Sequence, residues 1–308
     1  MNFSQKKIGI KELIHYSAII IAILGILFFI NKIRNEEINL YEVFKEVIKD
    51  KNLIFIELFL FILNFSLETF RWKILYRNIE NISFLQSLKT VLLATAFGNS
   101  TPGGLGEHIA RINGNAEIKG SLVTSVIASF LQTTTIVLFA LFAFVTIGFS
   151  LVINRYTILF LIISISFIIF ILVLKSDKNN VVRDFLNSIL SFDRKKIFKA
   201  LGFNTLRYIV FSFQLFLLLN NSNEKLDIEI LIQIPIYYLM ITIIPVQRIL
   251  DIGIKGSVAI YVFGNLLDVS EISSSILFIW LLNTLVPSLI GITIFFHSLL
   301  SNKKRTCN

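Results

Sequence analysis

Between two apolar segments, residues 91–97 and 121–148, the chain reads Asn99-Ser100-Thr101-Pro102-Gly103-Gly104-Leu105-Gly106-Glu107-His108-Ile109-Ala110-Arg111. A helix cannot continue through Pro102-Gly103-Gly104 without losing a hydrogen bond and backbone order. A helix that resumes after this break places Glu107 and Arg111, four residues apart, on one face. In a membrane, such a break persists only where protein buries it or where it lines a watery cavity. The sequence therefore predicts a functional site at this break.

The bulk composition is that of an integral membrane protein. The chain has 308 residues, of which 55% are hydrophobic and 16% are charged, and its mean hydropathy is +0.77. Soluble domains carry roughly 25% charged residues. Several charge-free runs reach the roughly 20 residues that a helix needs to cross a bilayer. We therefore expect an all-α integral membrane protein that forms a single polytopic membrane domain over residues 1–308, with no soluble domain.

Several other classes of protein are disfavoured. The net charge of +9 comes from basic residues in short connectors, where membrane topology explains them, and no nucleic-acid-binding motif is visible. The single cysteine, Cys307, lies in the tail, and the three histidines are scattered, so no internal disulfide and no metal-ligand spacing is present. No nucleotide-binding loop or nucleophile elbow occurs. The sequence predicts no nucleic-acid partner, no metal and no cofactor.

The apolar runs predict about eight membrane segments. Six are expected to span fully: residues 13–30, 53–70, 121–148, 156–174, 206–219 and 272–300. The first of these lacks a cleavage signature and is expected to be retained. Two further segments are broken helical hairpins, expected to be re-entrant. In residues 84–111 the charge-free run before the break is too short to cross, and in residues 230–267 an apolar run ends at Pro245 and resumes at Ser257.

The distribution of basic residues predicts the orientation. If neither broken hairpin crosses, the two termini and connectors 71–89 and 175–199 fall on one side, and they hold most of the basic residues. That side is then cytoplasmic. The opposite side receives residues 148–155 and 220–229, and connector 31–52, which carries several lysines, is the exception. The two broken hairpins then open in opposite directions, as at the midplane of transporters.

Charged residues gather at both breaks. Each ionised side chain at bilayer depth costs roughly 2.5–3.5 kcal/mol on insertion scales. Glu107, Arg111, Arg248, Asp251 and Lys255 therefore either pair inside a cavity or lie at headgroup level. The neighbouring proline and glycine breaks favour the cavity.

Three further features bear on the predicted site. The triplet Arg71-Trp72-Lys73 is either an interface anchor, the simpler interpretation, or a site for an anionic headgroup. The amides of Gly103-Gly104-Leu105-Gly106 could cradle a phosphate ahead of a helix. His108 either belongs to the site or is an interfacial histidine without a special role.

At these residues the chain resembles the flippase-like membrane domain of the lysylphosphatidylglycerol synthase family, which includes a group of uncharacterised membrane proteins. The resemblance covers roughly residues 13 to 300 and rests on three motifs. These are Glu68-Thr69-Phe70-Arg71-Trp72-Lys73, the run from Asn99 to Glu107 with Arg111, and Ile244-Pro245 followed by Asp251-Ile252-Gly253-Ile254-Lys255-Gly256-Ser257.

That resemblance implies a multi-pass protein of the bacterial cytoplasmic (inner) membrane that handles a lipid or lipid-linked substrate and moves it between leaflets. The synthases carry a soluble aminoacyl-transferase domain after the membrane part. This chain stops at Asn308, so we expect the aminoacylating activity to be missing.

The leading hypothesis is a flippase-like transporter that is not an enzyme. Arg71, Arg111 and Lys255 would bind a phosphate, while Glu107 and Asp251 would position these cations or meet an aminated headgroup. The whole predicted substrate-binding set is Arg71, Trp72, Lys73, Asn99, Pro102, Gly103, Gly104, Gly106, Glu107, Arg111, Pro245, Asp251 and Lys255.

Two rival hypotheses remain. The first is a non-transporting scaffold or accessory subunit that presents lipid to a separate lipid-modifying enzyme. The second is a membrane-embedded glycosyl or acyl transferase, which ranks last because only Glu107 and His108 offer an acid beside a base. The sequence names neither the lipid nor the oligomeric state.

Overall fold

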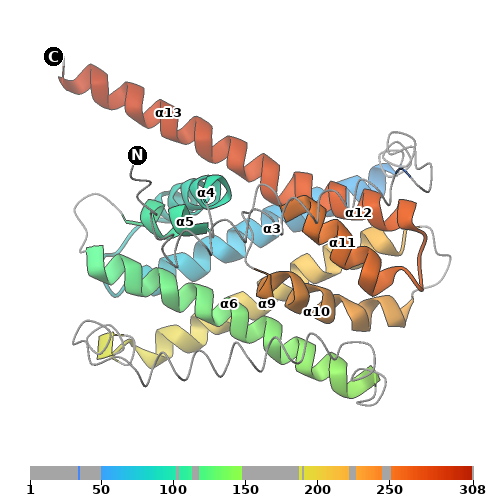
Figure 1. The fold of residues 1–308 in the computed structure, drawn as a ribbon. Coiled ribbons are helices and arrows are strands. Elements are labelled where there is room, and N and C mark those ends of the chain that lie inside the picture. Colours follow the sequence, from blue (N-terminus) through green and yellow to red (C-terminus); the bar gives the residue numbers. More distant parts are fainter. Residues whose placement is uncertain are drawn as a thin grey trace, which may run out of the picture.

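The computed structural model describes residues 34, 50–101, 104–112, 118–147, 187–188, 191–221, 227–244 and 251–306. Within these residues every regular element is a helix (Figure 1), as the sequence predicts. The elements are α3 (Lys51–Tyr76), α4 (Phe84–Ser100), α5 (Leu105–Ala110), α6 (Ile118–Ile147), α9 (Arg194–Leu219), α10 (Ile228–Ile243), α11 (Asp251–Phe263), α12 (Val269–Trp280), the π-helix η3 (Leu281–Leu285) and α13 (Val286–Thr306).

Four helical stretches in the described part are long and apolar enough to cross a membrane: Lys51–Tyr76, Ile118–Thr146, Arg194–Leu219 and Val269–Ser298. They are compatible with a multi-pass membrane protein. The predicted spans 13–30 and 156–174 lie outside the described residues, so the total of about eight membrane segments stays a prediction.

The predicted start of one span was wrong. α9 begins at Arg194, inside the region 175–199 that we expected to be a polar connector. Asp193 caps the helix by accepting a hydrogen bond from the Lys195 amide, at 2.9 Å. The lysines at the start of α9 are good helix formers, so this polar stretch forms a solvated end of the helix and not a loop. α3 likewise extends beyond both ends of the predicted span 53–70.

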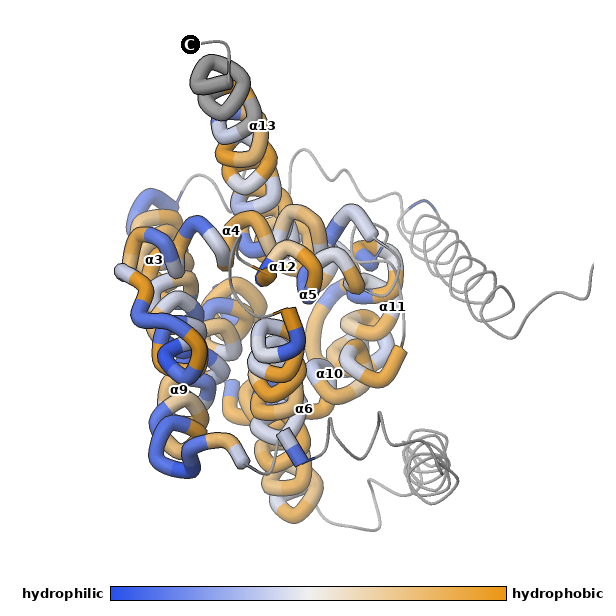
Figure 2. Tube along the Cα trace, turned by 90° about the vertical axis from the view of Figure 1, so that its left-hand side faces the viewer, coloured by the Kyte–Doolittle hydropathy of each residue, from blue (hydrophilic) through white to orange (hydrophobic). Residues whose placement is uncertain are grey.

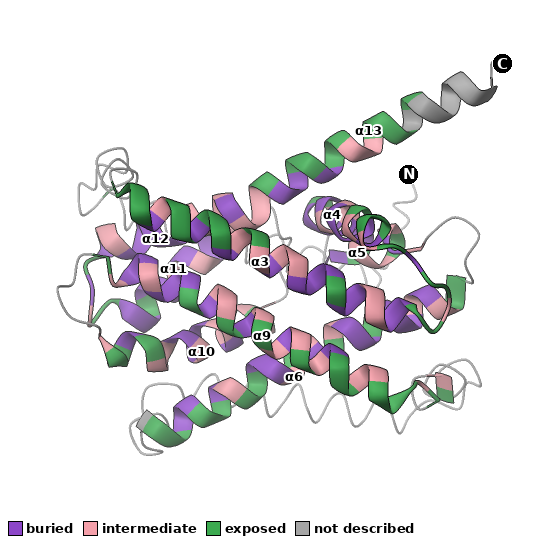
Figure 3. Ribbon diagram, turned by 180° about the vertical axis from the view of Figure 1, so that it is seen from behind, coloured by how far each residue is buried: buried purple, intermediate pink, exposed green. Residues whose placement is uncertain are grey.

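α3 runs through the middle of the bundle and packs against α9, α4 and α6 (Figure 1). Arg71 near the end of α3 bonds Asn204 in the first half of α9, and Glu57 near the start of α3 bonds Gln214 near the end of α9. These two contacts make α3 and α9 antiparallel neighbours. Figure 3 shows that the buried positions face inward, while α3, α9, α12 and α13 present exposed positions outward.

The outward face of the bundle is apolar. Phe55, Phe130, Phe142 and Val145 are each more than two-thirds exposed. Figure 2 shows hydrophilic residues at one end of α3 and α9, and largely hydrophobic residues along α6 and α10. An extended apolar exterior with polar ends is the arrangement expected for helices in a bilayer.

The first break lies where the sequence predicts it. α4 ends at Ser100, and its C-cap Thr101 is extended (φ −118°, ψ 145°). Gly104 then adopts the left-handed region (φ 72°, ψ 16°), which favours glycine, and α5 begins. The Thr101 hydroxyl donates to the Phe97 carbonyl at 2.8 Å and accepts from the Gly106 amide at 2.7 Å. Gly106 packs so closely on the Phe97 carbonyl that a Cβ would overlap it, which holds α5 against α4.

The second break separates α10 from α11. α10 ends at Ile243, its C-cap Ile244 is extended, and a new helix begins at Asp251. At 1.5 Å per residue the two helices are about 24 and 20 Å long, shorter than the roughly 30 Å hydrocarbon core. We expected the apolar run to resume at Ser257, but α11 begins earlier and includes both Asp251 and Lys255. The re-entrant course of the two broken elements stays a prediction.

Candidate functional site

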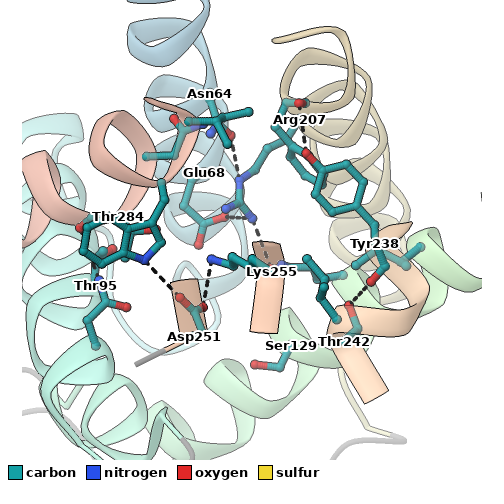
Figure 4. Close-up of a pocket in the computed structure, with 18 of the residues that line it drawn as sticks. Asn64, Glu68, Thr95, Ser129, Arg207, Tyr238, Thr242, Asp251, Lys255 and Thr284 are labelled. Atoms are coloured by element: carbon teal, nitrogen blue, oxygen red, sulfur yellow. Dashed lines mark hydrogen bonds and ion pairs between the residues drawn. The ribbon is translucent and has the colours of Figure 1, made fainter. Parts of the chain in front are cut away.

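A cavity of about 510 Å³ lies between the two breaks (Figure 4). Its wall is built by α3, α4, α5, α6, α9, α10, α11, α12 and η3. The charged side chains of the wall are Glu68, Glu107, Arg111, Arg207, Asp251 and Lys255. The polar neutral ones are Asn64, Thr95, Asn99, Ser129, Gln132, Thr133, Tyr237, Tyr238, Thr242, Trp280, Asn283 and Thr284.

Glu68 is the centre of one charged cluster in this wall. Its carboxylate, which is 5% exposed, forms ion pairs with Arg71 at 2.6 Å, Arg111 at 3.0 Å and Arg207 at 3.2 Å. These arginines come from α3, the end of α5 and α9. One carboxylate therefore holds three segments together, and the cluster retains positive charge because three cations share it.

Arg71 is committed to the protein interior. Besides Glu68, it donates to the Ala128 carbonyl at 3.0 Å and the Asn204 side chain at 2.7 Å. Asn204 in turn donates to Thr135 at 2.7 Å. Arg71 is 2% exposed and does not line the cavity. The expectation that it would bind a substrate phosphate therefore does not fit its position, because its guanidinium is held by Glu68, Ala128 and Asn204.

The other two residues of the triplet Arg71-Trp72-Lys73 do not form an exposed interface anchor. Trp72 is fully buried, and the guanidinium of Arg111 lies 4.7 Å above the centre of its ring. This is cation–π geometry. Neither Trp72 nor the half-buried Lys73 lines the cavity. Trp72 supports a cavity residue from behind, so its role is indirect.

Glu107 and Arg111 share a helix face, as their spacing predicts. The Arg111 guanidinium pairs with the Glu107 carboxylate at 2.8 Å as well as with Glu68. Arg111 is 3% exposed, and its Nε and Nη1 have no hydrogen-bond partner among the described residues. His108, between them in sequence, contacts the Ser125 hydroxyl at 2.7 Å and ties α5 to α6.

The second break supplies a separate ion pair. Lys255 Nζ lies 2.8 Å from Asp251 Oδ2, and the side chains are 23% and 16% exposed. The Trp280 indole donates to Asp251 Oδ1 at 3.0 Å. Figure 4 shows Lys255 and Asp251 on the cavity wall together with Glu68 and Arg207. Within the described residues Asp251 is the sole ion-pair partner of Lys255, so the Lys255 ammonium group can turn to another anion at low cost.

Asn99 and the glycines shape the wall. The Asn99 amide donates to the Ser288 hydroxyl at 2.6 Å and the Thr284 carbonyl at 3.3 Å, so it fastens α4 to the last helical stretch. Gly104 and Gly106 set the path of the chain at the first break. Pro102, Gly103, Pro245 and Arg248, which the sequence analysis includes at the breaks, lie outside the described residues.

Sequence reasoning missed two charged residues of the site. Glu68 occurs among the predicted features only as the first residue of a motif, and Arg207 is not among the candidate residues. Arg207 donates to Asn64 at 3.0 Å and Gln132 at 3.1 Å, besides its pair with Glu68. One signal was available: Thr69-Phe70-Arg71-Trp72 echoes Thr205-Leu206-Arg207-Tyr208, and the two arginines of this echo meet at the same carboxylate.

The charges of the ion-pair network around the cavity do not cancel. The charged side chains that line the cavity balance, with three cations and three carboxylates. Arg71, buried behind the wall, adds a fourth cation to the same ion-pair network. One positive charge is in excess when all are ionised. In the described part of the chain no group of three histidine, cysteine or acidic side chains is arranged to hold a metal ion.

Fold and site together define a helical protein with membrane-compatible helices and a charged cavity to which both broken elements contribute. Comparison with protein-family models and with curated proteins found no match for this chain.

Proposed function

We propose that the protein is a flippase-like lipid transporter, not an enzyme, whose cavity binds an anionic or lipid-linked headgroup. The observation that carries the proposal is the excess of one positive charge in the ion-pair network around the cavity, counted with the buried Arg71 behind the wall. An anionic phosphate headgroup supplies the missing negative charge, and a buried cation is strongly stabilised when it is paired and hydrogen-bonded.

The size of the cavity supports a ligand of this kind. Its volume of about 510 Å³ lies within the roughly 300–1,000 Å³ usual for small-molecule sites. The lining combines hydroxyl, amide and charged groups with Phe65, Phe211 and Ile279. A phosphate headgroup with the first part of a lipid tail needs both kinds of surface.

Lys255 and Arg207 are the residues that we propose contact the headgroup. Lys255 is partly exposed to the cavity and paired with one carboxylate, so its ammonium group can turn from Asp251 toward a phosphate oxygen. Asp251 keeps the Trp280 indole as a donor when this happens. Arg207 is also partly exposed, at 20%. Arg111 adds positive charge from a fixed position.

The resemblance to the flippase-like domain of the lysylphosphatidylglycerol synthases agrees with this proposal. It implies a protein of the bacterial cytoplasmic membrane, and the distribution of basic residues predicts that both termini lie in the cytoplasm. Two interrupted helices that face one cavity are a known way to build a substrate site near the membrane midplane. The partner is then a membrane lipid or a lipid-linked substrate, and movement between leaflets would proceed by exchanging ion-pair partners across the cavity.

The experiment is to purify the protein in mild detergent and identify the lipids that co-purify by mass spectrometry. Wild type is compared with Lys255→Gln and Arg111→Ala. The matched control is Lys89→Gln, which removes an exposed lysine on α4 that does not line the cavity. We expect one anionic or lipid-linked species to be lost in both cavity variants and kept in the control.

The opposite result would favour the scaffold hypothesis. If no lipid is selectively retained, or if the same lipid is retained at the same level in Lys255→Gln, the cavity is not a headgroup site. Arg111→Ala alone cannot decide this, because Arg111 also joins Glu68, Glu107 and Trp72. A chemically altered lipid after incubation with purified protein would instead support the transferase hypothesis.

The proposed orientation has its own test. In a background with Cys307→Ser, single cysteines at Lys119 and Glu224 are labelled from each side of the membrane. We expect the two positions to be accessible from opposite sides. Labelling of both from the same side would refute the three full spans predicted between them, and with them the proposed orientation.

A further inference from the structure

Glu57 is a buried carboxylate of α3 outside the arginine cluster. Its side chain is 0% exposed, although its neighbours Phe55 and Phe59 are exposed on the apolar exterior. Glu57 precedes Glu68 by about 16 Å along the helix axis, from the 1.5 Å rise per residue. Among the described residues no lysine, arginine or histidine forms an ion pair with it.

Two amide side chains connect Glu57 with the cavity. Gln214 donates from Nε2 to Glu57 Oε2 at 3.1 Å and to the Glu57 carbonyl at 3.2 Å. Asn283 donates from Nδ2 to Gln214 Oε1 at 3.1 Å, and Asn283 lines the cavity. Asn283 belongs to η3, and π-helical turns are frequent at functional sites.

This chain of hydrogen bonds is incomplete. Glu57 Oε1 and Asn283 Oδ1 are both buried and have no hydrogen-bond partner in the described part of the chain. The groups facing Glu57 are Gln214 from α9, Asn283 beyond it from η3, and Tyr238 from α10, whose hydroxyl interacts electrostatically with the Glu57 charge. None of them is a cation.

An ionised carboxylate in such a place is costly. Burial removes the water that would solvate the charge, and no cation among the described residues pairs with the carboxylate. One hydrogen bond from a side-chain amide does not compensate for both losses. Taking up a proton removes the charge. Ionisable residues inside membrane proteins are rare, and they mark functional sites such as ion pathways and proton relays.

We propose that Glu57 is a proton-binding site linked to the occupancy of the cavity through Gln214 and Asn283. The carboxylate takes one proton from water to become a carboxylic acid and returns it to water when it ionises. No other bond changes. An anion in the cavity makes a second negative charge at Glu57 more costly. Anion binding and protonation therefore favour each other, and the coupling is reciprocal.

The link to lipid rests on the proposed function, whereas the proton site does not. The first experiment therefore uses no lipid ligand. Infrared difference spectra of the purified protein are recorded after pH jumps. We expect a titrating carboxyl band that disappears in Glu57→Gln and remains in Glu57→Asp and in Glu80→Gln, which changes an exposed carboxylate. A band unchanged in Glu57→Gln would overturn the proton site.

The second experiment measures affinity for short-chain phosphatidylglycerol as a function of pH. In wild type, affinity should fall with rising pH by up to about tenfold per pH unit, the limit for one linked proton. In Glu57→Gln this dependence should vanish while binding persists. In Asn283→Leu the infrared band should remain and the pH dependence should weaken.

The two failures can be told apart. If phosphatidylglycerol does not bind wild type at any pH, the choice of headgroup fails while the infrared result still decides the proton site. If binding persists and Glu57→Gln keeps the wild-type pH dependence, the coupling is refuted. Binding that varies with Na⁺ at fixed pH and not with pH would also refute it.

Discussion

The two helix breaks carry the same local device in different surroundings. Each is followed by a helix with an acidic residue and, four positions later, a basic one: Glu107 with Arg111 on α5, and Asp251 with Lys255 on α11. An acid placed before a base suits both the helix dipole and the side-chain geometry. Sequence spacing alone makes the two pairs look equivalent.

Their environments make them different. Arg111 is 3% exposed, shares a second carboxylate with Arg71 and Arg207, and stacks on Trp72. Lys255 is partly exposed to the cavity and pairs with Asp251 alone in the described structure. The ion pairs at the first break are therefore fixed by their buried surroundings. At the second break, Lys255 can exchange Asp251 for another anion. A cavity with one fixed wall and one adaptable wall is suited to capturing and releasing a headgroup.

The largest expected effect that distinguishes the two breaks is that of Glu68→Ala. It leaves Arg71, Arg111 and Arg207 without their shared carboxylate, and breaking a buried ion pair by removing one partner costs roughly 3–5 kcal/mol. Thermal unfolding in detergent should show a large loss of stability. Asp251→Ala, the control at the second break, should cost much less. Equal losses of stability in Glu68→Ala and Asp251→Ala would show that the two breaks do not differ in rigidity.

The next effect concerns the backbone of the first break. Gly106→Ala places a Cβ against the Phe97 carbonyl and near the Thr101 hydroxyl, so α5 must shift; overpacking of this kind costs roughly 1–3 kcal/mol. Gly202→Ala is the matched control, since a Cβ there meets nothing within 4 Å. In the middle of α9 that change should stabilise by roughly 1 kcal/mol. Unfolding midpoints that move in the same direction would contradict this account.

These examples show what the sequence predicts and what it does not. Pro and Gly chemistry predicts the break before Leu105, and four-residue spacing predicts the Glu107–Arg111 pair, because both are local. The contact of Glu68 with Arg111 and Arg207 joins residues from three segments, and spacing along the chain says nothing about which helices meet. Arg71 illustrates the error that results: its charge was taken for a phosphate ligand, but the contacts of α3 with α6 and α9 occupy it.

A smaller effect on stability should follow from replacing the arginine of the first break by lysine and the lysine of the second break by arginine. Arg111→Lys keeps the charge but loses the planar guanidinium that reaches two carboxylates while stacking on Trp72. We expect a loss of roughly 1–2 kcal/mol, mostly from the cation–π contact. Lys255→Arg should change stability little, because the side chain has room in the cavity. If both exchanges are neutral in thermal unfolding, Arg111 is not fixed by its surroundings.

The smallest expected effect is the coupling between Asp251 and Lys255. A double-mutant cycle with Asp251→Asn and Lys255→Gln isolates this pair from their other contacts. Because both side chains are partly exposed, the coupling free energy of unfolding should be under about 1 kcal/mol. A bound headgroup must displace the Asp251–Lys255 ion pair, which is possible only if that pair is weak. A low coupling free energy, together with loss of the co-purifying lipid in Lys255→Gln, would therefore assign Lys255 to headgroup binding. A coupling as large as the effect of Glu68→Ala would make the second break as rigid as the first, and the exchange of partners that we propose could not occur there.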